Sequence, residues 1–303
     1  MQQQNSKPSK PHSISIIIPF HIKDEKFLDN VINLFNLANE NINLKEFIIV
    51  FNAVDKHSEE NFEKLLNIKA KHNSKLKKIY FKEALIIGKA RNVGADFASS
   101  DYLLFIDSDV DVPKESFQNL STFLNNNTNQ VNALMPHLKL HDTSTIWAML
   151  DSYEDKISYE SRICGKETIS LIGPFLLVDK DIYYNCGKFE EKKICAEDRE
   201  FAIRMIKKGY KIHFNKHVVV THKNDPTLKR LIYRKKFHAE ANAFIYTNHP
   251  DYYKKNLKNW AQYLVRSIIP SHPLHSLVYI TIKVYYIFWF TYFLKKHKKW
   301  RKE

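Results

Sequence analysis

The chain has 303 residues and a formal net charge of +14, and 44% of its residues are hydrophobic. This length and composition indicate a folded protein with one large domain and a smaller extension. With only 6 Gly, and neither a G-x-G-x-x-G nor a G-x-x-x-x-G-K-[ST] pattern, the sequence excludes a glycine-rich nucleotide loop. Its three cysteines form no C-x-x-C pair, so neither a disulfide framework nor a zinc knuckle is indicated, and a reducing cytosol is expected.

Residues 1–12 are polar and predict a disordered leader instead of a secretory signal. Strand-like and helix-like segments then alternate up to about residue 225. The expected strands cover 14–20, 47–51, 78–81, 101–106, 131–140, 169–178 and 211–220. The expected helices cover 25–41, 58–72, 88–98, a segment after Pro113, a segment with Trp147 and Met149, and 196–208. This alternation predicts an α/β fold with six or seven strands, mostly parallel, joined by helical crossovers.

The apolar strand at 101–106 is followed by Asp107-Ser108-Asp109, and Asp111 comes two residues later. In open α/β sheets, ligands bind beyond the carboxyl ends of the strands. Two carboxylates separated by one residue repel each other unless a hard divalent cation neutralises them. The pattern therefore predicts a metal site. The alternative is a plain turn, with Asp111 stabilising the start of the helix after Pro113.

The helix expected at 196–208 carries Asp198, Phe201 and Met205 on one face. Because Phe201 and Met205 have to point inward, Asp198 in the first turn is expected at the edge of the same interior. Glu197 and Asp198 either act in catalysis or stabilise the positive end of the helix dipole. The solvated face is expected to carry the basic residues Arg199, Arg204, Lys207 and Lys208.

Two further residues allow two interpretations each. His222 ends the strand that follows the acidic helix, and is either a structural histidine or a ligand. Arg91, in the helix at 88–98, either reaches a diphosphate or the catalytic base, or is an ordinary surface arginine.

Four segments occur in a fixed order: Ile16-Ile17-Ile18-Pro19-Phe20, Gly88-Lys89-Ala90-Arg91-Asn92-Val93-Gly94, Asp107-Ser108-Asp109, and Glu197-Asp198 before a helix end at 204–210. Together they resemble an inverting glycosyltransferase of family 2 with the GT-A nucleotide-sugar fold, and the likeness spans 13–222. The resemblance implies a Rossmann-like, mixed and mostly parallel sheet flanked by helices. It divides the chain into a leader (1–12), a catalytic domain (13–225) and a helical extension (226–303).

The resemblance also implies the roles of single residues. Asp198, with Glu197 beside it, is implied as the catalytic base. Mn²⁺ or Mg²⁺ is implied as the cofactor, with Asp107, Asp109 and His222 as its ligands. Binding of the nucleotide-sugar donor is implied for Pro19, Phe20, Asn52, Arg91, Asp107, Ser108 and Asp109. The implied reaction is transfer from a UDP-sugar to a glycan or lipid-linked acceptor during bacterial surface polysaccharide biosynthesis.

The sequence departs from the family after the second strand. Where the family carries Asp-Asp-Gly-Ser, this chain has Phe51-Asn52-Ala53-Val54-Asp55, although the Asn52 amide oxygen still offers an acceptor to a uracil imide. UDP is the expected nucleotide, with GDP or TDP as alternatives. Two other functions stay open. One is a catalytically inactive binding or scaffold protein with this fold. The other is a nucleotidyltransferase, although such an enzyme normally has a basic loop that binds the triphosphate, and residues 19–23 do not provide one.

The end of the chain is aromatic and basic. Eight of the 18 residues from Leu277 to Leu294 are aromatic, Lys283 is the one charge among them, and six basic residues follow before the end. We expect an interfacial helix; packing on the domain or on a second subunit, and a true membrane span, are the alternatives. A basic helix upstream is expected to extend the same face with Lys229, Arg230, Arg234, Lys235 and Lys236. These features predict peripheral binding to the anionic inner face of the cell membrane, and no nucleic-acid partner because no binding motif accompanies the charge.

Overall fold

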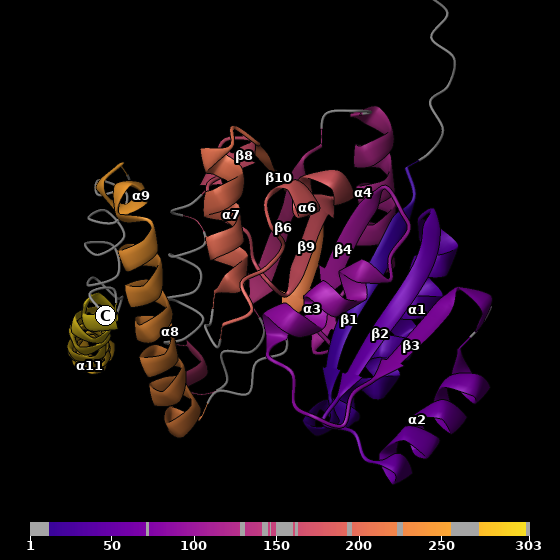
Figure 1. Cartoon of the computed structure of the whole chain (residues 1–303), viewed down its shortest axis with the longest axis horizontal. Helices are drawn as coiled ribbons and strands as arrows, with labels where there is room; N and C mark the ends of the chain where they lie inside the picture. Colours follow the sequence, from indigo (N-terminus) through magenta and orange to yellow (C-terminus); the bar gives the residue numbers. More distant parts are fainter. Residues whose placement is uncertain are drawn as a thin grey trace, which may run out of the picture.

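The computed structural model describes residues 12–70, 73–127, 131–140, 145, 147–149, 160, 163–192, 196–222, 227–255 and 273–300. Within these residues, ten strands form one mixed sheet in the order β3-β2-β1-β4-β9-β6-β10-β8-β7, with β5 paired to β10 (Figure 1). Helices cover both faces of the sheet, so the predicted α/β architecture is confirmed. The predicted leader, 1–12, lies almost entirely outside the described residues.

The first half of the sheet is parallel. Strand β1 (Ile14–His21) lies between β2 (Leu44–Asn52) and β4 (Tyr102–Ile106), and β3 (Leu76–Tyr80) pairs with β2. The segments that connect these strands are η1 (Ile22–Phe27), α1 (Leu28–Asn41), α2 (Lys56–Lys69), η2 (Asn73–Lys75) and α3 (Ile87–Asp96). All four strands therefore present their carboxyl ends at the same edge of the sheet.

The second half of the sheet contains both parallel and antiparallel strand pairs. Strand β9 (Phe175–Asp179) runs antiparallel between β4 and β6 (Ala133–Leu140), and β10 (Ile212–His222) runs parallel to β6. The seven predicted strands are present, but the expected total of six or seven was too low. The three others have two residues each, too few to leave a periodic pattern: β5 (Val110–Asp111), β7 (Ile163–Cys164) and β8 (Glu167–Thr168).

The remaining helices are α4 (Lys114–Asn126), α6 (Lys180–Asn185), α7 (Glu197–Lys207), α8 (Leu228–Asn248), α9 (Pro250–Lys255) and α11 (Pro273–Trp300). Helices α1, α2 and α4 bury their apolar residues on one face of the sheet, and α3, α6 and α7 on the other. The expected strand over 169–178 is present only from Phe175, because a turn at Gly173 and Pro174 interrupts it.

The two glycines of the 88–94 segment allow close contacts of α3. A Cβ on Gly94 would lie 2.3 Å from Ile17 Cγ2 on β1, and a Cβ on Gly88 would lie 2.3 Å from the Glu190 carbonyl oxygen. Both distances are too short for real atoms, so larger residues would push α3 away from β1 at Gly94 and from the 189–190 segment at Gly88. These glycines therefore set the position of Arg91, which lies between them on the same helix.

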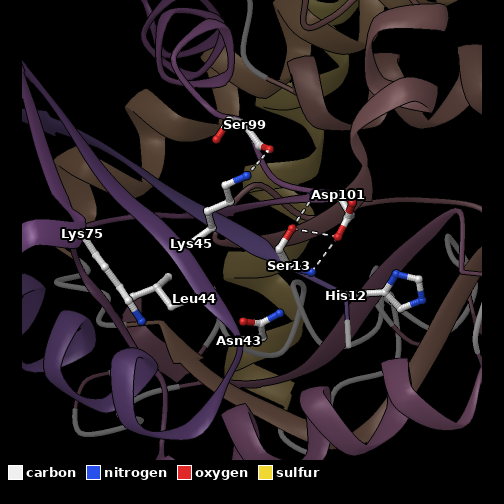
Figure 2. Close-up of a pocket in the computed structure, with 8 residues that line it drawn as sticks. All are labelled: His12, Ser13, Asn43, Leu44, Lys45, Lys75, Ser99 and Asp101. Atoms are coloured by element: carbon white, nitrogen blue, oxygen red, sulfur yellow. Dashed lines mark hydrogen bonds between the residues drawn. The ribbon is translucent and has the colours of Figure 1, made fainter. Parts of the chain in front are cut away.

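A hollow of about 630 Å³ lies at the amino-terminal edge of the sheet. Figure 2 shows Ser13 donating to the Asp101 carboxylate and the Lys45 ammonium donating to the Ser99 carbonyl oxygen. The residues that line it are His12, Ser13, Asn43, Leu44, Lys45, Lys75, Ser99 and Asp101. They precede or begin β1 to β4, so the hollow lies at the edge opposite to the carboxyl ends, where ligands of such sheets bind.

Glu46, at the same edge, is the buried acidic residue of a hydrogen-bonded cluster. Burial alone would raise the pKa of Glu46, but donors from Ser15, Ser99 and Lys77 outweigh it and lower the pKa to about 2. This value lies below the ordinary 4.5, so the carboxylate stabilises the fold fully above about pH 4.5. The stabilisation is lost as the pH falls through about 2.

Glu46→Gln is expected to lower the free energy of unfolding at neutral pH by about 1.5–3 kcal/mol, the range for hydrogen bonds to a charged group. The difference from the wild type should shrink when urea unfolding is repeated at about pH 3. Glu60→Gln, in an exposed pair with Lys56, is the matched control and should change little. An E46Q deficit that is equal at both pH values would contradict the ionised role.

The carboxyl-terminal helices pack on the preceding part of the chain through polar and apolar contacts. Leu231 on α8 and Ile282 on α11 are buried together, with Trp147 against them. Asn242 on α8 accepts from Arg199 on α7 at 2.5 Å and donates to the Tyr286 hydroxyl on α11 at 2.7 Å. The predicted boundary at 225 falls in a stretch outside the described residues. None of the helices in the described part of the chain is both long and apolar enough to span a bilayer.

Two of the basic residues expected on the solvated face of α7 make internal contacts instead. Arg204 donates to the Glu200 carboxylate at 2.8–2.9 Å and to the carbonyl oxygens of Cys186 and Lys188, and Arg199 donates to Asn242. The expectation was wrong because α7 is flanked by the 186–188 turn on one side and by α8 on the other. Lys207 and Lys208 are exposed, as expected.

Candidate functional site

Asp109 and His222 meet because two strands pair. Asp107 and the turn at 108–109 follow β4, and β5 then pairs antiparallel with the end of β10, opposing Val110 to His222. The Asn30 side-chain amide holds this turn by donating to the carbonyl oxygens of Ser108 (2.9 Å) and Val110 (2.8 Å). His222 Nε2 lies 3.3 Å from Asp109 Oδ1 as a result.

Asp111 is not the N-cap residue of the helix that follows. Asp111 lies in β5, and the N-cap of α4 is Pro113, which makes no side-chain cap. The turn after β4 brings Asp109 close to His222 at the end of β10.

The Asp109–His222 pair shifts both pKa values toward the charged forms. Burial raises the pKa of Asp109, but the hydrogen bond and charge of His222 outweigh it, so the pKa is lowered. Burial lowers the pKa of His222, and Asp109 and Asp107 reverse this, so the pKa is raised. Arg230 contributes to lowering the pKa of Asp109, and Arg234 opposes the rise at His222. The amino-terminal half of α8 therefore adds positive charge beside the strand ends.

Arg91 is at the centre of a buried ion-pair network. Only 1% exposed, it donates from Nη2 to Asp107 Oδ1 at 2.6 Å and to the Gly173 carbonyl oxygen at 3.1 Å, and from Nη1 to the Glu197 carboxylate. The alternative of a surface arginine is therefore wrong, because α3 turns this residue toward the sheet. By contacting both carboxylates, Arg91 joins the turn after β4 to the first turn of α7.

Glu197 and Asp198 differ in their surroundings. Burial raises the pKa of Glu197 to about 7, although the Arg91 guanidinium acts to lower it. Asp198 is only partly buried, and its Oδ2 accepts from the Gly173 amide at 2.6 Å. The N-cap of α7 is Ala196, in the left-handed region with φ 77° and without a side-chain cap. Neither acid is thus the N-cap residue, and Asp198 is the more accessible of the two.

The predicted nucleotide-binding residues divide into two groups. Pro19 and Phe20 are buried, and the Phe20 ring packs against those of Phe51 and Phe62, so these two side chains belong to the core. Asn52, at the end of β2, donates its Nδ2 to the Phe20 carbonyl oxygen at 3.1 Å. Its Oδ1 is buried and has no hydrogen-bond donor among the described residues.

The loop after β2 keeps the conformation that a glycine normally supplies. Ala53, where the family has glycine, has φ 59°, which an L-residue adopts at a cost of about 1–2 kcal/mol. The Ala53 amide donates to the Glu83 carbonyl oxygen at 3.0 Å, which holds the loop in place.

Asp24 is an acidic residue of this region that the sequence interpretation missed. It lies in η1, three residues after the end of β1, and accepts from the His21 amide at 3.2 Å. Burial raises the pKa of Asp24, the charge of Asp109 adds to that rise, and a hydrogen bond with the Ser108 side chain opposes it. Its position just beyond the carboxyl end of a predicted central strand was the signal that could have identified it.

The residues at the strand ends fit a divalent cation bound together with a diphosphate. In the part of the chain that the structure describes, no three His, Cys, Asp or Glu side chains gather closely enough to hold a metal by themselves. Asp109 and His222 supply an oxygen and a nitrogen donor side by side, whereas Asp107 contacts Arg91. Protein sites for Mg²⁺ commonly use one or two carboxylates and complete the shell with substrate phosphates.

Solved structures that share the fold include complexes with nucleotide sugars. A mannosyltransferase from Pyrobaculum calidifontis, in complex with GDP-Man and Mn²⁺, is 16% identical with a TM-score of 0.60, and the match covers 98% of this chain and 89% of that one. S. aureus TarS (residues 1–349), in complex with UDP-GlcNAc, is 14% identical with a TM-score of 0.53, covering 95% and 92%.

GalNAc-T7, with UDP, GalNAc and Mn²⁺, is 15% identical with a TM-score of 0.55, covering 78% of this chain and 51% of that one. The structural matches show that the fold is that of the GT-A glycosyltransferases. No curated protein matches the sequence.

The family called Glycosyl transferase family 2 matches residues 15–187, more than half of the chain. This protein belongs to that family, as the four sequence segments predicted. The match includes β1, α3 and the Asp107-Ser108-Asp109 turn, while α7, β10 and His222 lie beyond it.

Proposed function

We propose that this chain is an inverting, metal-dependent glycosyltransferase that moves a sugar from a nucleoside diphosphate donor to a glycan or lipid-linked acceptor. Residues 13–225 carry the catalysis, and the product belongs to a bacterial surface polysaccharide. One observation carries the proposal: Arg91 contacts both Asp107 and Glu197, so the acidic turn after β4 and the acidic start of α7 share one site.

The donor is proposed to be a UDP-sugar, and support for this comes from the end of β2. The unsatisfied Asn52 Oδ1 is suited to accept from the imide N–H of uracil. Arg230 and Arg234, on the positive side of the site, suit the diphosphate. Asp109, Asp107 and His222 are the proposed ligands of Mn²⁺ or Mg²⁺, which when bound would neutralise part of the diphosphate charge.

Asp198 is the proposed general base. Its partly exposed carboxylate takes the proton of the acceptor hydroxyl, whose oxygen forms a bond to the anomeric carbon. The bond from that carbon to the diphosphate oxygen breaks, and the nucleoside diphosphate leaves with the electron pair. A single displacement inverts the configuration at this carbon. Glu197, bound to Arg91 and buried, positions the start of α7 in this scheme.

Thermal unfolding with UDP and Mn²⁺ tests the donor site. UDP and Mn²⁺ together are expected to raise the free energy of unfolding of the wild type, by about 2.7 kcal/mol when the ligand is at 100 times its dissociation constant. UDP alone or Mn²⁺ alone should raise it less. The Asp109→Asn variant is expected to lose most of this stabilisation by UDP and Mn²⁺, because the substitution replaces a negatively charged ligand of the cation with a neutral one. Asp181→Asn, on the exposed side of α6, is the control. Equal stabilisation of the D109N variant would exclude the metal role of Asp109.

A catalytically inactive scaffold protein is the alternative from another class. Incubation of the full chain with UDP-sugars and Mn²⁺, followed by measurement of released UDP, separates it from an enzyme. Metal-dependent release of UDP supports the transferase. Binding of UDP without any release over a range of donors and acceptors would favour the scaffold.

A further inference from the structure

We propose that α11 docks on the surface of an anionic lipid bilayer through its outward side, which goes beyond the sugar transfer proposed above. Large apolar side chains recur on this side at helical spacing and are exposed: Ile280 (44%), Val284 (62%), Ile287 (50%), Phe288 (61%) and Tyr292 (50%). We call these five residues the apolar face. Solvent-exposed apolar patches of this kind mark interaction surfaces.

The opposite side of α11 already has its partner within the chain. Ile282 and Phe293 are buried, and Tyr286 accepts a hydrogen bond from Asn242 on α8. The Lys236 ammonium lies 3.8 Å from the centre of the Trp289 ring, which fastens the middle of α11 to α8. The inward contacts hold α11 in one orientation, and the apolar face therefore stays outward.

Figure 1 places α11 at one end of the long axis of the molecule, with α8 between it and the sheet. No other element of the described chain is drawn beyond it on that side. A flat partner can approach the apolar face without contacting the strand ends that carry Asp107 and Asp109.

The positive charge near the apolar face favours an anionic lipid surface, instead of a second copy of the chain, as its partner. Lys295 and Lys296 follow the apolar face on the same helix and are exposed, and the sequence continues with Lys298, Lys299, Arg301 and Lys302. Basic residues near an anionic membrane strengthen binding to it. A second copy would instead bring another chain of net charge +14 to the same surface, where like charges repel.

The aromatic content of α11 fits the same partner. Phe288 and Tyr292, both on the apolar face, are 61% and 50% exposed. Tyrosine and tryptophan prefer the boundary between lipid headgroups and acyl chains, where one end of the ring is wet and the other is apolar. Apolar, aromatic and basic residues thus occur in the arrangement of a helix that lies in the interface.

Sedimentation of the full chain with vesicles tests the proposal. The wild type is expected to bind vesicles of phosphatidylcholine and phosphatidylglycerol, more weakly at high salt, and to bind pure phosphatidylcholine poorly. The double variant V284D/F288D should bind at least about 10-fold more weakly, because two apolar contacts become charged. Its circular dichroism should match the wild type, since both positions are more than half exposed.

Ile68→Asp is the matched control, because Ile68 is an equally exposed apolar residue (70%) on α2, away from the extension. This variant should bind vesicles as the wild type does. Vesicle binding that is unaffected in V284D/F288D, or absent in the wild type, would overturn the proposal. So would a wild-type dimer that V284D/F288D converts to monomers without any change in lipid binding, because the apolar face would then join two copies.

Discussion

Asp198→Asn is expected to lower the rate of sugar transfer by about 10²–10⁴-fold, the contribution typical of a general base. The asparagine oxygen can still accept from the Gly173 amide, as the Asp198 carboxylate does at 2.6 Å. The start of α7 should therefore keep its position, and binding of UDP with Mn²⁺ should be retained. Initial rates of transfer, measured together with thermal stabilisation by UDP and Mn²⁺, separate the loss of a base from a loss of structure.

Glu197 is the neighbouring acid that tests this assignment. Glu197→Gln keeps a hydrogen-bond acceptor for Arg91 but removes a charge, so it should reduce stability more than it reduces the transfer rate at saturating donor. A D198N variant that transfers sugar at the wild-type rate, while E197Q does not, would move the base to Glu197.

Arg91→Met is expected to lower the free energy of unfolding by about 3–5 kcal/mol, the cost of removing one partner from a buried ion pair. The variant leaves the Glu197 carboxylate buried without its cation and frees Asp107 from its 2.6 Å contact. Burial already raises the pKa of Glu197 to about 7, and without the guanidinium we expect Glu197 to take up a proton. Urea unfolding of the wild type and variant measures the loss.

Lys89→Met is the matched control, since Lys89 precedes Arg91 on α3 but is exposed, and it should change stability by less than about 0.5 kcal/mol. The double variant R91M/E197Q should be more stable than the sum of the two single losses predicts, because it leaves no unpaired charge at Glu197. Additive losses would mean that Arg91 and Glu197 do not interact as the structure shows.

The sequence predicted the features that depend on local patterns. Apolar runs identified the long strands, and the alternation with helices indicated a mostly parallel sheet, because side chains repeat every two residues in strands and about every 3.6 in helices. Asp107 and Asp109 were located at a strand end, and Phe201 and Met205 on the buried side of α7, where both are now found fully buried. Four short segments in order were enough to identify the family.

Contacts between distant parts of the chain were decided only in the folded molecule. Arg91 and Glu197 are 106 positions apart, and nothing in the residues around Arg91 distinguishes a buried arginine from a surface one. The Asp109–His222 contact depends on the pairing of β5, a strand of two residues that leaves no periodic signal.

The same distinction holds for the extension and for the nucleotide site. The composition of 277–294 predicted an aromatic helix, but which of its residues face α8 depends on the partner helix and not on α11 itself. Asn52 was identified as a polar residue after β2, whereas its unsatisfied oxygen is visible only once the neighbouring chain segments are in place. Periodicity can be recognised from consecutive residues. Long-range pairing depends on the free energy of the complete packed structure, and no single segment of the sequence determines that free energy.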